Sequence, residues 1–263
     1  MIYLVVCGTA LLVSALTLFS GFGLGTLLMP AFALFFPVEV AVAATAVVHL
    51  ANNVFKAFLL GRRADWKVVA VFGVPGALAA LAGAGLLDTL AGLPPLATWA
   101  LAGRPREVTV VKLVIAALML AFAVLDLVPA LERVRIARRW LALGGLLSGF
   151  FGGLSGHQGA LRTAFLAKLG LDAQAFVATG TVAAVIVDAA RLSAYGMAFA
   201  AGSLDAVLAE RGGVALVAAA SAAAFAGSFA GTRLLRRVTM RSIRALVGVM
   251  LALVALALGT GLV

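Results

Sequence analysis

Nine apolar segments follow one another along this chain of 263 residues and constrain its fold more than any other feature. They cover residues 2–19, 22–36, 38–60, 68–90, 108–128, 140–170, 173–201, 213–232 and 242–262. Several reach the roughly 20 residues that an α-helix needs to cross a bilayer. The hydrophobic fraction of 64% exceeds the approximately 45–50% of soluble domains. Because the segments are continuous and do not alternate in polarity, they predict an all-α polytopic membrane protein and not a β-barrel.

A short motif occurs twice, as Ser20-Gly21-Phe22-x-x-Gly25 and as Ser148-Gly149-Phe150-x-x-Gly153. Each copy is followed by a helical segment with the same pair of small residues, Ala44-Thr45 or Ala178-Thr179. Duplicated halves with glycine-broken helices are typical of secondary transporters. Residues 1–36 would form a straight helix of about 54 Å, longer than a hydrocarbon core of about 30 Å. We therefore expect helical hairpins at 1–36 and 140–170, broken around Gly21, Gly23 and Gly25 and between Gly149 and Gly159.

The loop charges distinguish two topologies. If each broken segment crosses the membrane once, the two faces carry eight and nine basic residues, which gives no bias. If each returns to its starting side, thirteen basic residues lie on one face, and Arg104, Arg106, Lys112 and Arg211 lie on the other. The second arrangement follows the positive-inside rule. It predicts two inverted repeats, with both termini outside. Arginine greatly outnumbers lysine and alanine is abundant, which fits a GC-rich bacterial genome, so we expect a bacterial inner membrane with both termini in the periplasm.

The predicted repeats have defined bounds. The first repeat covers 1–130, with the hairpin 1–36 and single helices at 38–60, 68–90 and 108–128. Residues 131–139 form a cytoplasmic linker. The second repeat covers 140–263, with the hairpin 140–170 and helices at 173–201, 213–232 and 242–262. Asp65-Trp66 is expected to cap the helix after it and to anchor an aromatic ring at the membrane interface.

Polar residues inside membrane spans are costly and are usually functional. In 38–60, Thr45, His49, Asn52 and Lys56 share one helical face, and Asn53 lies beside it. This face either meets substrate or forms a polar seam between helices. Lys56 lies near the end of the helix, and the alternative for it is that its ammonium group extends to the membrane interface.

The second half carries further polar residues. Thr179, Asp188 and Arg191 lie in 173–201. Asp188 and Arg191 either form a structural ion pair or bind an anion together. The second hairpin carries the densest polar cluster, comprising Ser155, Gly156, His157, Gln158 and Arg162. Broken helices expose backbone amides that bind anions, and Arg162 would add a positive charge. Alternatively, His157 and Arg162 only satisfy backbone carbonyls.

Several functional classes lack support. No spacing of ligands predicts a metal site, no motif predicts a cofactor, and no nucleophile with a positioned base predicts an enzyme. The formal charge of +10 fits a membrane protein with basic cytoplasmic loops better than a nucleic-acid partner. Cys7 is the only cysteine, so no internal disulfide forms.

Taken together, these residues resemble the sulfite exporter TauE/SafE family of bacterial carriers. The resemblance is carried by the broken hairpins and by three segments, Gly21–Pro30, Gly61–Trp66 and Gly227–Gly231. The second hairpin departs from the family pattern, because His157, Gln158 and Arg162 stand where a run of glycines is common. The resemblance implies transport of sulfite or an organosulfonate.

Within the predicted spans, basic side chains outnumber the one acid that lies well inside a span, Asp188, which also favours an anion. We expect a secondary transporter that holds a small anion at the midplane between the hairpin tips, with coupling to protons through a histidine or Asp188. The alternatives are an anion channel and a carrier for a non-sulfur organic anion. The oligomeric state is open.

Overall fold

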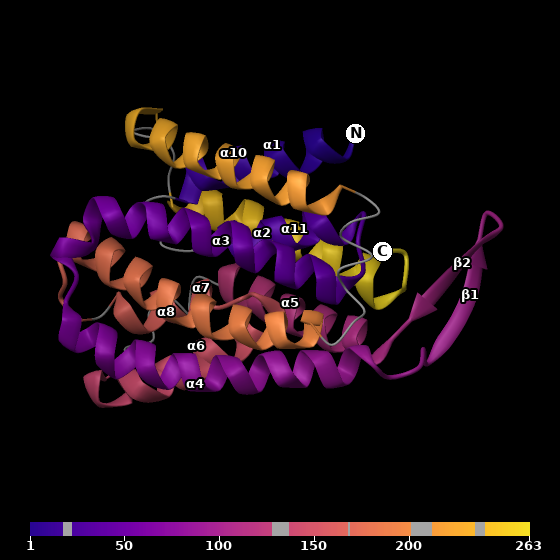
Figure 1. Cartoon of the computed structure of the whole chain (residues 1–263), viewed down its shortest axis with the longest axis horizontal. Helices are drawn as coiled ribbons and strands as arrows, with labels where there is room; N and C mark the ends of the chain where they lie inside the picture. The colour runs from indigo at the N-terminus through magenta and orange to yellow at the C-terminus, as the bar shows by residue number, and fades with distance from the viewer. Residues whose placement is uncertain (18–22, 128–136, 168, 201–211, 235–239) are drawn as a thin grey trace.

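The computed structural model describes residues 1–17, 23–127, 137–167, 169–200, 212–234 and 240–263. Within these ranges it contains ten α-helices, two 3₁₀ helices and one β-hairpin (Figure 1). The first half comprises α1 (Ile2–Thr17), α2 (Leu24–Ala33), α3 (Val38–Leu60), η1 (Gly61–Arg63), α4 (Trp66–Ala91), β1 (Ala97–Leu101), β2 (Arg104–Val108) and α5 (Val110–Leu127). The second comprises η3 (Arg138–Trp140), α6 (Leu141–Ser155), α7 (Gly159–Leu166), α8 (Ala173–Ala200), α10 (Gly213–Leu234) and α11 (Met240–Gly259).

Four helical segments are long and apolar enough to cross a membrane. They are Val38–Arg63, Trp66–Ala91, Ala173–Met197 and Gly213–Gly231. Four further apolar helical segments are shorter, namely Ile2–Leu16, Leu24–Ala33, Val110–Val124 and Val247–Gly259. The prediction of an all-α polytopic membrane protein is therefore confirmed.

Asp65 caps α4 as expected. Its carboxylate oxygen Oδ1 accepts hydrogen bonds from the backbone amides of Lys67 and Val68, at 3.0 and 3.1 Å. Two of the amides that have no partner within the helix are thereby satisfied. Trp66, the next residue, is 61% exposed.

The second helical break is narrower than predicted, and the motif copy lies outside it. Helix α6 continues through Gly149 and Gly153 and ends at Ser155, and α7 begins at Gly159. Gly156 ends α6 in the left-handed region at φ 80°, a conformation that glycine adopts without steric cost. The first motif copy differs in position, because its Gly25 lies inside α2, after the break. The last glycines of the two copies thus differ in place, since Gly153 lies within α6 and Gly25 within α2. Ser20 to Phe22 lie outside the described residues.

Helix α7 folds back along α6. The hydroxyl of Ser148 donates to the backbone carbonyl of Gln158 at 2.8 Å. Further along, Gly144 packs against the ring of Phe165, so closely that a Cβ at Gly144 would overlap it. Later residues of α7 thus meet earlier residues of α6, and the two helices form a hairpin.

Small residues bring two pairs of helices into backbone contact. Along α6, Gly145 meets the backbone of Phe72, and Gly149 meets that of Gly76 in α4. In the same way, Gly227 and Gly231 of α10 meet the backbone of α1 at Leu11 and Ala15. Such close approach is a common way for helices to associate in membranes, where lipid removes the hydrophobic drive between them.

The helices α3 and α8 run antiparallel. His49 near the middle of α3 contacts Asp188, whereas Gly61 just after α3 packs near Val182. The amide of Asp65, further on, donates to Thr179 Oγ1 at 2.9 Å. Along these contacts the residue number increases in one segment and decreases in the other, which is the pattern of antiparallel packing.

Helices α5 and α11 are also antiparallel. Gly248 lies near Leu127, and Gly259 lies near Ala116. These pairs again run in opposite directions along the two helices.

A β-hairpin projects from one end of the bundle, where the sequence analysis expected no strand (Figure 1). Strands β1 and β2 are joined by Ala102 and Gly103 at φ 50° and 74°, the pattern of a two-residue hairpin turn. Trp99 Nε1 donates to the carbonyl of Thr260 and Arg106 Nη1 to that of Leu262, at 2.9 and 2.7 Å. The chain end after α11 is therefore attached to the hairpin.

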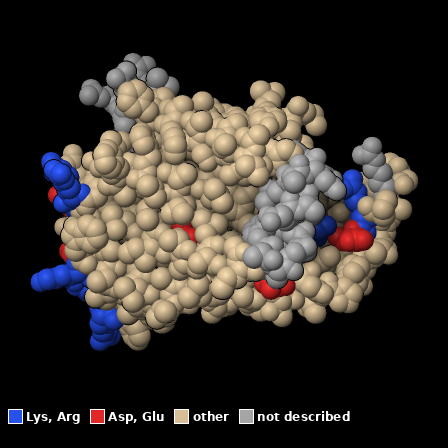
Figure 2. All heavy atoms as spheres, viewed as in Figure 1, with Lys and Arg blue, Asp and Glu red and all other residues tan. Residues whose placement is uncertain are grey.

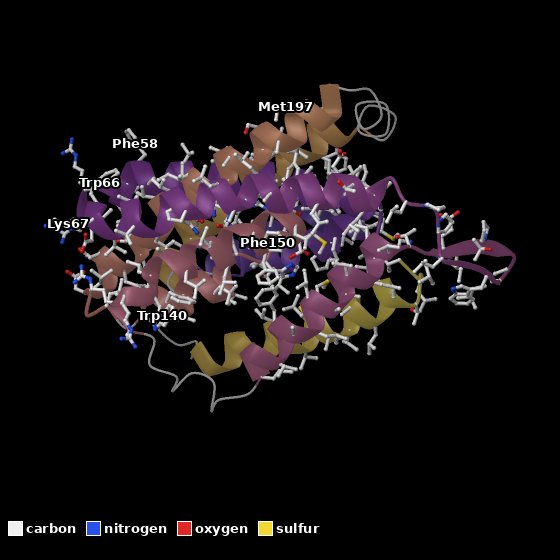
Figure 3. All side chains as sticks on the ribbon, turned by 90° about the horizontal axis from the view of Figure 1, so that it is seen from below. Phe58, Trp66, Lys67, Trp140, Phe150 and Met197 are labelled. Carbon is white, nitrogen blue, oxygen red and sulfur yellow. The ribbon has the colours of Figure 1, made fainter. Side chains whose placement is uncertain are left out.

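Exposed basic side chains gather at the opposite end (Figure 2). The described and exposed members of this group are Arg62, Arg63, Lys67, Arg138 and Arg139. Trp66, Lys67 and Trp140 lie together there, far from the hairpin (Figure 3). The Arg139 guanidinium lies 5.6 Å from the centre of the Trp140 ring. Basic and aromatic side chains together are typical of a membrane interface.

Candidate functional site

Asp188 forms the centre of a buried polar cluster in α8 and is fully shielded from solvent. Its Oδ1 accepts hydrogen bonds from Arg191 Nε and Nη2 at 2.9 and 2.7 Å, and from Gln158 Nε2 at 2.7 Å. Its Oδ2 lies 2.7 Å from His49 Nδ1 and 3.4 Å from Asn53 Nδ2. Side chains from α3, from α8 and from the break between α6 and α7 therefore meet at one carboxylate.

Arg191 is held by the protein in this conformation. Besides the two bonds to Asp188, its Nη1 donates to the carbonyl of Gly152 at 2.9 Å. One turn further along α8, the Tyr195 hydroxyl donates to the carbonyl of Gly153. The three-residue spacing places Asp188 and Arg191 next to each other on α8. The hydrogen bond to α6 fixes the orientation of the Arg191 side chain. Of the two interpretations, this geometry favours the structural ion pair.

The position of the proton on His49 follows from its neighbours. A short contact to a carboxylate requires Nδ1 to carry a hydrogen, so Nε2 of a neutral ring accepts. Asn53 Nδ2 lies 3.0 Å from His49 Nδ1 and 3.3 Å from His49 Nε2, so it packs against the ring between the two nitrogens. Through its contact with Asp188, His49 joins α3 to α8.

The two helical breaks approach each other beside this cluster. A Cβ placed on Gly25 would lie 3.1 Å from the carbonyl oxygen of Gly156 and 3.6 Å from His49 Cδ2. Only a glycine permits so close an approach without a shift of the neighbouring backbone. The start of α2 and the end of α6 are therefore in contact, next to His49.

Buried basic groups exceed buried acidic groups in this region. Among the residues whose burial is described, Lys56, Arg162 and Arg191 are buried, and Asp188 is the one buried carboxylate. Arg162 Nη1 donates to Gln158 Oε1 at 3.3 Å, which links it to the Asp188 cluster. Buried charges require compensation, and an excess of positive charge favours an anionic ligand.

Several buried polar atoms have no hydrogen-bond partner among the described residues. They include Thr45 Oγ1, Asn52 Nδ2, His157 Nε2 and Thr163 Oγ1. His157 Nδ1 lies 2.8 Å from the carbonyl of Ser155, and its ring stacks on Phe122 with 5.6 Å between centroids. Unsatisfied buried groups are rare in folded proteins, so these atoms are available to hydrogen-bond a ligand or water.

The structure brings together only part of the predicted site. His49, Asn53, Gln158, Asp188 and Arg191 form the cluster, Gly25 and Gly156 form the contact of the breaks, and Arg162 is linked through Gln158. Gly23 caps the start of α2 at φ 121°, and Gly21 lies outside the described residues.

Other predicted residues have structural partners elsewhere. Thr179 accepts from the amide of Asp65 at the start of α4. Asn52 Oδ1 accepts from Ser228 in α10 at 2.8 Å, and the Ser155 hydroxyl donates to the carbonyl of Phe151 within α6.

The sequence analysis placed Lys56 on the candidate face but left it open to snorkelling, and it did not assign Ser228 or Tyr195 to the site. Lys56 is only 8% exposed, so it does not snorkel to solvent within this structure. Its position on the His49 face was the available signal, because four-residue spacing places both side chains on one side of α3. No pattern in the sequence indicated the contacts of Ser228 and Tyr195.

No group of three histidine, cysteine or acidic side chains capable of holding a metal ion occurs within the described ranges. The apolar helices define a multi-pass membrane protein that encloses a buried polar cluster. A family model described as "Sulfite exporter TauE/SafE" matches residues 6–258. The chain belongs to this family, whose members are transporters of sulfur-containing anions and not enzymes. No curated protein and no solved structure matches the chain.

Proposed function

We propose that this protein is a secondary transporter that moves a small sulfur oxyanion, such as sulfite or an organosulfonate, across the bacterial inner membrane. The observation that carries the proposal is the excess of buried basic side chains beside two touching helical breaks. An anion at the breaks would offset the positive charge of Arg162, and amides at the helix starts would add donors. Arg191 would act mainly by holding Asp188 and the α6 backbone in place.

The inverted-repeat architecture is part of this proposal. Antiparallel packing of α3 with α8 and of α5 with α11 is what two inverted halves, 1–130 and 140–263, would produce. Equivalent contacts of α1 with α10 and of α4 with α6 also agree with such a relation. Inverted repeats commonly hold their substrate at the repeat interface near the membrane midplane, where the hairpin tips would lie.

The charge distribution supports one orientation. The end that carries Arg62, Arg63 and Lys67 would face the cytoplasm, together with the linker 131–139. Both chain ends lie toward the opposite end, which carries the β-hairpin (Figure 1). We therefore propose that both termini are periplasmic.

Proton coupling would involve the cluster that joins the halves. His49 and Asp188 are in direct contact and join α3 to α8. A proton taken up by either residue would change the strength of this contact between the two helices. A carrier that alternates its access must change such contacts between repeats. If transport is coupled to protons, the pH of the vesicle lumen should change as the anion moves across the membrane.

The function can be tested with purified protein in proteoliposomes. Vesicles preloaded with unlabelled sulfite should accumulate labelled sulfite by exchange, and uptake should saturate. Sulfite-dependent conductance without exchange would favour an anion channel. Exchange of a carboxylate in place of sulfur anions would favour the carrier for a non-sulfur organic anion.

A further inference from the structure

We infer that the adjoining starts of α4 and α6 bind an anionic phospholipid. Its phosphate would contact Lys67 of α4 and Arg139, just before α6, and an acyl chain would follow the exposed apolar faces of the two helices into the membrane. The inference concerns the basic end of the bundle and not the buried cluster around Asp188 (Figure 3). It therefore does not depend on which anion the protein transports.

The helices α4 and α6 run parallel to each other with their backbones in contact. A Cβ on Gly145 of α6 would meet the carbonyl oxygen of Phe72 in α4, and a Cβ on Gly153 would meet that of Ala80. Residue numbers thus increase together along the two helices, and the same number of residues separates the contacts on each. Both helices therefore start at the same end of the bundle and at the same level.

This register brings two short segments side by side at the helix starts. Continued toward the amino ends, it places Arg139 and Trp140 next to Trp66 and Lys67, in agreement with the positions of the labelled residues in Figure 3. A basic side chain and an exposed indole are thus supplied by each helix start. Long, exposed lysine and arginine side chains on adjacent helices can contact one phosphate together.

The surface around these helix starts carries a net positive charge. Its exposed and described basic residues are Arg62, Arg63, Lys67, Arg138 and Arg139. None of them forms an ion pair with a described residue. The described acids at this end are Asp65 and Asp172, whose Oδ1 atoms accept hydrogen bonds from backbone amides at the starts of α4 and α8. Basic clusters of this size beside membrane spans attract anionic lipids.

The two tryptophans place this charge at the level of lipid headgroups. Trp66 and Trp140 are both exposed, and indole rings in membrane proteins prefer the interface between headgroups and acyl chains. The guanidinium of Arg139 lies 5.6 Å from the centre of the Trp140 ring. This cation–π contact holds the positive charge of Arg139 beside the ring, where a lipid phosphate lies.

Apolar faces continue from the polar groups along both helices. On α4, Lys67 is followed at spacings of four, three and four residues by Val71, Val74 and Leu78. On α6, Trp140 is followed at spacings of three and four by Leu143 and Leu147. All five apolar side chains are exposed, and each set shares one face of its helix. A phospholipid matches both the charged end and these faces, whereas a free phosphate would match the charged end alone.

Lipid binding to the full-length protein in neutral detergent can be counted by native mass spectrometry. Phosphatidylglycerol should bind at least about fivefold more tightly than phosphatidylcholine with the same acyl chains. The double variant Lys67→Gln/Arg139→Gln should bind the two lipids equally. A matched control, Arg104→Gln/Lys112→Gln, removes the same charge at the end with the β-hairpin and should keep the preference. Water-soluble glycerol phosphate at the lipid's concentration should not displace phosphatidylglycerol, because it lacks the acyl chains.

Three results would count against the inference. Equal binding of the two lipids by the unmodified protein would overturn it, and this comparison needs no variant. A preference that the double variant keeps, or that the control loses to the same extent, would show that lipid binding does not depend on these helix starts. Displacement by glycerol phosphate would overturn the role of the apolar faces. None of these results bears on sulfite exchange, so the proposed function is tested separately.

Discussion

His49 Nδ1 and Asp188 Oδ2 lie 2.7 Å apart, although 139 positions separate the two residues in the chain. The contact joins α3 of the first half to α8 of the second and is buried at both ends. Asp188 also holds Arg191, so one carboxylate fixes both a connection between halves and a buried cation. Loss of its charge should therefore affect folding as well as transport.

Asp188→Asn is expected to lower the free energy of unfolding by about 3–5 kcal/mol, the usual cost when a buried ion pair loses one partner. Arg191 would remain buried without its counter-charge. Thermal unfolding in the same detergent would measure the effect. Asp88→Asn, at an exposed position of α4, is the matched control and should leave the midpoint unchanged. Equal midpoints for the two variants would contradict a stabilising role of the Asp188 cluster.

Arg162→Ala should weaken anion binding by more than about tenfold, which corresponds to roughly 1.4 kcal/mol. The guanidinium is buried, so a bond between it and an anion is strengthened by the charge. Binding can be followed by calorimetry with sulfite. Arg139→Ala removes an exposed arginine and should have no effect. If Arg162→Ala folds normally and binds sulfite with unchanged affinity, Arg162 is structural.

Gly25→Leu should abolish transport while the protein still inserts into the membrane. The new side chain would meet the Gly156 carbonyl and the His49 ring, where the helical breaks touch. Gly156→Leu should act similarly, because the left-handed backbone at φ 80° is strained for leucine. Gly85→Leu is the control, since no atom lies within 4 Å of a Cβ placed there. Transport at normal rates by the Gly25 variant would argue against a functional role for this contact.

Single cysteines in a Cys7→Ser background test the orientation, because Cys7 is the only cysteine of the chain. Arg62→Cys should resist a membrane-impermeant maleimide in intact cells, whereas Thr98→Cys in the exposed β-hairpin should react. Both should react after permeabilisation. Labelling of Arg62→Cys from outside would invert the proposed topology.

The helical, multi-pass architecture was predictable because continuous apolar runs have few other solutions in a membrane. Asp65 was predictable as a cap because the role is local: its carboxylate bonds to backbone amides only two and three residues away. The β-hairpin was missed because its strands are only five residues each, and its attachments, to Thr260 and Leu262, are distant in sequence.

The site was only partly predictable. Spacing along one helix grouped Asp188 with Arg191, and the two are in contact. It also grouped His49 with Asn52 and set Asn53 beside that face, whereas the structure places Asn53 against His49 and bonds Asn52 to Ser228. It could not indicate that Arg191 also donates to Gly152, because that bond depends on how α6 packs against α8. The position of the break was also uncertain from sequence, since Gly149 and Gly153 serve helix packing and only Gly156 turns the chain.

Sulfite exchange by purified protein in proteoliposomes tests the central claim most directly. The account predicts saturable, counterflow-stimulated uptake of labelled sulfite that Arg162→Ala reduces strongly and Arg139→Ala leaves intact. Absence of sulfite exchange by a folded, correctly reconstituted protein would contradict it.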